Sequence, residues 1–223
     1  MTAPSDFLRR TPLHHLLAAE AAAWRPLADA AIAEFDGPLP PLAIADLSPL
    51  PRLGFKGRGT VPAMHARGIH VEAEANRAFR QPDGGLCLVL AASEVVLLSP
   101  LEGDGGKLER MEADWRLDDE ERAYPIPRRD ASAWFLVAGE KAPEMFAKIC
   151  GVDLRIDRFA DLSIAQTSVA KLTTIITRAD IGGITAFHLL ADSASAEYFL
   201  RCLRDAAEEF GGRTTGLSAL VQG

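Results

Sequence analysis

Three residues near the C-terminal end of the sequence have the types that form a catalytic triad. His188, Asp192 and Ser193 lie close together along the chain. A triad is defined by the spatial roles of its side chains, and these residues lie where a strand leads into a helix. Aspartate and serine are also the side chains that most often cap a helix N-terminus. The sequence therefore favours a helix cap over a nucleophile and its base.

The other histidines form no metal-binding pattern. His14 and His15 are adjacent and face different sides of a helix, while Gly68 separates His65 from His70. A zinc-binding helix needs two histidines four residues apart, and no pair here has that spacing. We expect no metal ligand and no catalytic residue in this chain, and the sequence does not indicate a cofactor-binding residue.

Two glycine-rich segments are candidates for anion binding. The run Gly-Phe-Lys-Gly-Arg-Gly at residues 54–59 precedes a predicted helix, and Gly-Gly-Lys-Leu occupies residues 105–108. The first run lacks the glycine spacing of a dinucleotide site, and the second lacks the hydroxyl that follows lysine in a phosphate loop. We interpret residues 54–59 as a strand-to-helix turn, with a small-molecule site between two lobes left open as an alternative. The acidic run at residues 118–121 is typical of a solvated face.

Composition excludes several classes of partner. The chain has 223 residues, 48% of them apolar, and a formal net charge of −7, which disfavours nucleic acid and anionic membrane surfaces. Cys87, Cys150 and Cys202 are odd in number and have apolar neighbours, so buried free thiols are expected. No secretory signal and no apolar stretch of transmembrane length is present, so we expect a cytoplasmic protein.

The first 41 residues predict an amphipathic helical arm. Thr11 and Pro12 are a typical helix start, and apolar residues recur at spacings of three and four as far as Phe35. Pro26 predicts a kink or two consecutive helices, and the segment Gly-Pro-Leu-Pro-Pro at residues 37–41 ends them.

Beyond this arm the pattern is that of strands alternating with short helices. Apolar and β-branched runs bounded by Gly, Pro or Asp predict strands at residues 52–56, 76–81, 86–90, 95–99, 133–138, 164–172, 173–178 and 184–190. Helices are expected at residues 60–67, from Pro143 to Gly151, and from Asp192 or Ser193 to Gly211. Residues 102–121 have weak periodicity and are predicted to form a long surface connection.

These elements predict an α+β fold. The two halves follow a similar order, which indicates two related lobes of antiparallel sheet covered by helices. The predicted division is a helical arm at residues 1–41, a first lobe at 42–122 and a second lobe at 123–223, with one continuous domain as the alternative.

Four segments of the chain resemble the gamma subunit of heterotetrameric sarcosine oxidase. They lie at residues 86–100, 133–159, 165–172 and 187–211, and they include Cys-Gly-Val-Asp-Leu at 150–154 and Ala-Gln-Thr at 165–167. The chain departs from that family's pattern at residues 93–96 and 124–129, which marks it as a divergent relative.

The resemblance implies a fold like the folate-binding domain of aminomethyltransferase, the T-protein of glycine cleavage. It also implies that the partners are the other subunits of a flavoenzyme complex, which would hold FAD, FMN, NAD and tetrahydrofolate. The expected function is therefore that of a non-catalytic scaffold subunit. The alternative is a stand-alone folate-binding protein of the aminomethyltransferase type.

Overall fold

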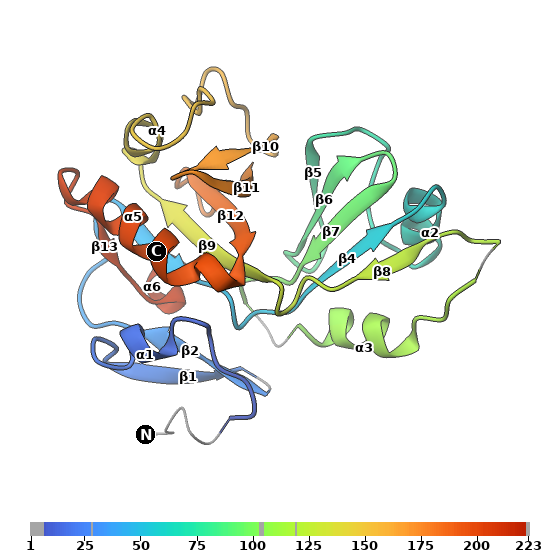
Figure 1. Ribbon diagram of the computed structural model, residues 1–223, viewed down its shortest axis with the longest axis horizontal. Coiled ribbons are helices and arrows are strands. Elements are labelled where there is room, and N and C mark those ends of the chain that lie inside the picture. The colour runs from blue at the N-terminus through green and yellow to red at the C-terminus, as the bar shows by residue number, and fades with distance from the viewer. Residues whose placement is uncertain (1–6, 28, 103–104, 119, 222–223) are drawn as a thin grey trace.

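Two antiparallel sheets form the centre of the computed structural model, which describes residues 7–27, 29–102, 105–118 and 120–221 (Figure 1). The five-stranded sheet has the order β5-β6-β7-β4-β8, and the six-stranded sheet has the order β10-β11-β12-β9-β3-β13. The strands of the first are β4 (Arg52–Lys56), β5 (Arg77–Arg80), β6 (Leu86–Ala91), β7 (Glu94–Leu98) and β8 (Tyr124–Ile126). Those of the second are β3 (Ala43–Asp46), β9 (Ser132–Ala138), β10 (Ile164–Val169), β11 (Leu172–Arg178), β12 (Ala186–Asp192) and β13 (Arg213–Thr214), of which β13 alone pairs in parallel.

Helices cover the outer face of each sheet. On the five-stranded sheet these are α2 (Thr60–Ala66) and α3 (Gly106–Asp114), and on the six-stranded sheet α4 (Ala142–Phe146) and α5 (Ala196–Glu208). The short α6 (Leu217–Val221) packs against the core between the sheets. The expected α+β class, with antiparallel sheets covered by helices, is confirmed.

Both faces of the central strands are buried. On β9, Trp134 and Leu136 face the core between the sheets, whereas Phe135 and Val137 face α4 and α5. This alternation follows from the period of two along a strand, and it explains why residues 133–138 are all apolar. The core between the sheets therefore joins them along their inner faces.

The two sheets repeat one order of elements. Strand β4 is followed by α2, three strands and α3, and strand β9 is followed by α4, three strands and α5. In both, the first strand lies beside the last of the following three, as the orders β5-β6-β7-β4 and β10-β11-β12-β9 show. The sheets do not follow the predicted division of the chain. Strand β3 lies in the predicted first lobe but joins the six-stranded sheet, and β8 lies in the predicted second lobe but joins the five-stranded sheet. That residues 42–122 and 123–223 fold as separate units stays a prediction.

The predicted N-terminal helical arm is wrong. Among its described residues only α1 (His14–Leu17) is helical, and the following residues form a hairpin of β1 (Ala23–Leu27) and β2 (Ala30–Glu34), drawn in blue in Figure 1. Pro26 is tolerated there because β1 pairs on one side only. Leu27 and Ile32 pack into the core between the sheets, so tertiary packing outweighs the helical spacing.

The predicted surface connection at residues 102–121 is also wrong in part, because it contains α3. Leu108 is buried, and Trp115 directly after the helix packs on Phe55 with ring centroids 4.2 Å apart. These two anchors, with Met111 between them, hold the helix on the sheet. A stripe of three apolar residues in an otherwise charged segment is too weak a pattern to predict a helix from sequence.

Candidate functional site

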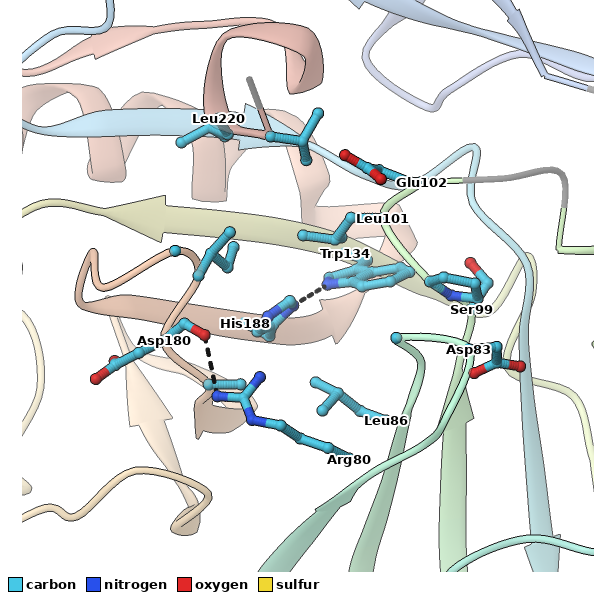
Figure 2. A pocket seen from close by; sticks show the side chains of 16 residues that line it. Arg80, Asp83, Leu86, Ser99, Leu101, Glu102, Trp134, Asp180, His188 and Leu220 are labelled. Carbon is cyan, nitrogen blue, oxygen red and sulfur yellow. Dashed lines mark hydrogen bonds between the residues drawn. The ribbon is translucent and has the colours of Figure 1, made fainter. Parts of the chain in front are cut away.

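A pocket lies at one end of the core between the two sheets (Figure 2). We call it the inter-sheet pocket; its volume is about 340 Å³. The ends of β5 and β6 and the segment after β7 line one side, and β9, β12, α6 and the turn at residues 179–182 line the other. The residues that matter to its chemistry are Arg80, Ser99, Trp134, Asp180 and His188.

Trp134 and His188 form the hydrogen-bonded floor of this pocket. Strand pairing sets Trp134 opposite Leu190, so His188 lies diagonally across from it on the same face of the sheet. The indole Nε1–H donates to Nδ1 of His188 over 3.1 Å. Because Nδ1 accepts this bond, the hydrogen of the neutral imidazole is on Nε2. Nε2 has no hydrogen-bond partner among the described residues.

Burial keeps His188 uncharged. The side chain is 3% exposed, and removal from water lowers the pKa of His188 to about 3, with the positive charge of Arg80 as a second cause. Figure 2 shows the imidazole between Trp134 and Arg80. At neutral pH His188 is therefore a hydrogen-bond donor to the pocket and has little capacity to act as a base.

Arg80 is held at the pocket wall by acidic and carbonyl groups. Its Nη2 donates to both carboxylate oxygens of Asp161, at 3.2 and 3.0 Å, and to the carbonyl oxygen of Asp180 at 3.0 Å. Asp180 in turn accepts from Arg178, at 2.7 Å for Oδ2. The charge of Arg80 is therefore largely compensated by protein groups.

Ser99 contributes a hydroxyl without a partner. It is 3% exposed and lines the pocket, and its Oγ is buried with no hydrogen-bond partner in the described part of the chain. No base within the described residues is bonded to this hydroxyl, so the geometry of an activated nucleophile is missing. The arrangement is suited to binding an uncharged group.

The sequence-based interpretation of Asp192 as a cap is confirmed. Its Oδ1 accepts a hydrogen bond from the backbone N–H of Ala194 at 2.9 Å, where the 3₁₀ turn Ser193–Ser195 leads into α5. His188 points to Trp134 instead, so the three candidate triad residues do not come together.

The glycine run at residues 54–59 comprises the end of β4 and the turn into α2, and two amides of that turn already have partners. The N–H of Gly57 donates to the carbonyl of Ser93, and the N–H of Gly59 to the carbonyl of Arg122. A Cβ on Gly59 would collide with the carbonyl oxygen of Glu121, so glycine is needed for close packing. Glu121 is the last residue of the acidic run at residues 118–121, and its carboxylate forms an ion pair with Arg67 at 2.5 Å. Residue 119 of this run lies outside the described residues.

The remaining candidates are also accounted for by packing. Within the described ranges no cluster of three His, Cys, Asp or Glu side chains could hold a metal ion. Cys87 is buried, which raises the pKa of its thiol to about 12, and Cys150 and Cys202 are half-buried free thiols. No helix in the described parts of the chain has the length and apolarity needed to cross a bilayer.

The sequence left a small-molecule site between two lobes open as an alternative, but it did not indicate which residues line the inter-sheet pocket. The signal that could have indicated it is His188, the one polar residue in the apolar run 186–191 of β12, because a buried polar side chain requires a partner. Its partner Trp134 is 54 residues away in the chain, so no local pattern connects them.

Two solved structures have the same fold. A chain of the heterotetrameric sarcosine oxidase from Corynebacterium sp. U-96, solved in complex with pyrrole 2-carboxylate, matches with a TM-score of 0.67 and 20% identity, over 92% of this chain and 98% of that chain. Aminomethyltransferase T of the glycine cleavage system from Bartonella henselae matches with a TM-score of 0.66 and 13% identity, over 96% of this chain and 62% of that chain. No family model and no curated protein sequence matches the chain. The predicted resemblance is thus confirmed as a shared fold: this chain is built like a chain of heterotetrameric sarcosine oxidase and like aminomethyltransferase T.

Proposed function

We propose that this chain is a non-catalytic subunit of a cytoplasmic, sarcosine-oxidase-like flavoenzyme. The assembly would carry out the oxidative demethylation of an N-methyl amino acid. Its other subunits would hold the FAD, FMN, NAD and tetrahydrofolate, and this chain would bind none of these cofactors and act as a scaffold.

The extent of the structural match is the observation that carries this proposal. The similarity spans 98% of one chain of a heterotetrameric enzyme, so it involves a whole subunit. The similarity to aminomethyltransferase T spans only 62% of that longer protein, which has a further part without a counterpart here. A chain that corresponds to one entire subunit is best explained as a subunit itself.

The chemistry of the described side chains supports a structural role. The most deeply buried ionisable groups bond to the protein: Arg52 to backbone carbonyls, Asp46 to Thr11 and Ser48, and His188 to Trp134. Burial raises the pKa of Asp46, but hydrogen bonds from Ser48 and Thr11 occupy its carboxyl group. Each of these groups is hydrogen-bonded within the fold, which supports a structural role.

Isolation of the tagged chain from its own host tests this proposal. We expect it to elute in an assembly that absorbs at flavin wavelengths and that releases formaldehyde from an N-methyl amino acid. A chain that elutes alone, with no flavoprotein subunit bound, contradicts the proposal.

The alternative is a stand-alone folate-binding protein, favoured by the 96% of this chain that aligns with aminomethyltransferase T. Calorimetry with tetrahydrofolate separates the two functions, because the scaffold proposal predicts no specific heat of binding by the isolated chain. Saturable binding would favour the alternative.

A further inference from the structure

Two polar groups that line the inter-sheet pocket lack a hydrogen-bond partner among the described residues. Ser99 Oγ is buried and unpartnered, and Nε2–H of His188 has no acceptor among the described residues. A buried polar group without a partner destabilises a protein by about 1–3 kcal/mol, and such groups are uncommon in folded proteins. The hydroxyl of Ser99 is such a group, and His188 lines the same pocket with a donor that has no acceptor among the described residues, which together indicate that a ligand supplies the missing partners.

The surrounding charges disfavour an anionic ligand. Near the pocket there is one acid more than there are bases, namely Asp83, Asp161, Asp180 and Glu102 against Arg80, Lys107 and Arg178. An anion is disfavoured by this excess, and Arg80 is already paired with Asp161. A cationic amine gains nothing from His188, because Nε2–H is a donor.

The other side chains that line the pocket favour a largely apolar ligand. Leu86, Leu101, Trp134 and Leu220 line the pocket beside the two polar groups. A volume of about 340 Å³ is at the small end of ligand pockets, which are mostly apolar with a few placed polar groups. This size fits a single ring system and its substituent.

We propose that the inter-sheet pocket binds an uncharged, largely apolar small molecule with a carbonyl or ring-nitrogen acceptor. The acceptor takes the hydrogen bond from Nε2–H of His188, and a second polar group of the ligand pairs with the hydroxyl of Ser99. This binding is a property of the single chain and does not depend on partner subunits.

Three probes of similar size test the chemistry: benzamide, benzoate and benzylamine. The observable is the Nε1–H resonance of Trp134 in NMR spectra of the full-length chain, because this group bonds directly to His188. We expect benzamide to shift the resonance in a saturable manner, and the anion and the ammonium ion to do so only at much higher concentration. No saturable shift with benzamide, or equal affinity for all three, overturns the proposal.

Two variants separate ligand binding from stability. Ser99→Ala removes a hydroxyl that has no partner among the described residues, so folding is retained while benzamide binding weakens about fivefold through loss of one hydrogen bond. Thr60→Val is the matched control, because Thr60 Oγ1 is also buried and unpartnered in the described part of the chain but lies on α2, outside the pocket. Equal benzamide affinity in the wild type and Ser99→Ala contradicts the assigned contact, and equal weakening by Thr60→Val contradicts the assigned site.

Discussion

The guanidinium of Arg52 donates a hydrogen bond to the backbone carbonyl of Ser132 and so joins the start of β4 to the start of β9. The same side chain also donates to the carbonyls of Ser48 and Leu50, both at 2.9 Å, and of Arg129 at 2.5 Å. These carbonyls lie on the two segments where the chain crosses between the sheets. Burial lowers the pKa of Arg52 to about 10, so the group stays charged at neutral pH.

Replacement of Arg52 by methionine is expected to destabilise the protein by about 3 kcal/mol or more, because several buried carbonyls lose their donor. Urea unfolding followed by circular dichroism measures this change. Arg158→Met is the control, since Arg158 is 66% exposed and its ion pair is with Asp157 at 3.5 Å; it should change stability by less than about 0.5 kcal/mol. Equal unfolding free energies for the two variants would show that Arg52 does not hold the sheets.

Gly59 tests the interpretation of the glycine run as a packing turn. Gly59→Ala is expected to destabilise the protein by about 1–3 kcal/mol, since the new Cβ collides with the carbonyl of Glu121. Gly151→Ala is the control because a Cβ at that residue would meet no described atom within 4 Å, and its φ is not in the left-handed region. Thermal unfolding of both variants measures the change in stability. A midpoint for Gly59→Ala equal to that of the wild type contradicts the close approach of Gly59 to the carbonyl of Glu121.

The pH dependence of stability follows from His188. The pKa of His188 is about 3 in the folded protein, whereas the ordinary value of 6.5 applies to the unfolded chain. Between these two pH values the unfolded chain therefore binds a proton that the folded chain does not. Stability is thus full above pH 6.5 and falls as the pH decreases towards 3. From pH 7 to pH 4.5 this loss amounts to about 2.5 kcal/mol.

Comparison with His188→Phe isolates that contribution from those of other titrating groups. Unfolding free energies of both proteins at pH 7 and pH 4.5 provide the measurement. The variant should lose less stability than the wild type over this interval, and parallel losses would contradict a buried, neutral His188.

The tautomer of His188 gives a fourth, spectroscopic prediction. At pH 7 the ¹⁵N shifts should show Nδ1 without a proton and Nε2 with one, because Trp134 donates to Nδ1. Trp134→Phe removes that donor and should permit the other tautomer. A protonated Nδ1 in the wild-type protein is the result that this geometry does not allow.

Much of the fold could be predicted from local patterns. The strand and helix signals at residues 52–56, 60–67, 86–90 and 133–138 agree with β4, α2, β6 and β9, because β-branched runs, glycine stops and apolar periods act locally. The hairpin β1–β2 could not be predicted, since its alanine-rich segments have helical spacing and only the packing of Leu27 and Ile32 makes them strands.

The candidate site was beyond local reasoning for a similar reason. Trp134 and His188 become neighbours only through the pairing of β9 with β12, and Ser99 reaches the same pocket from the other sheet. His188 and Asp192 are close along the chain, but no hydrogen bond joins them among the described residues. His188 accepts from Trp134 instead, and Asp192 accepts from Ala194.

The proposed function requires that this chain contribute structure and no catalysis to a flavoenzyme. Formaldehyde release from sarcosine, measured in parallel for the isolated chain and for the assembly purified from its host, tests that claim most directly. We expect turnover by the flavin-containing assembly and none by the chain alone. Turnover by the isolated chain, or a flavin-free chain with no partner subunit in its host, would contradict it.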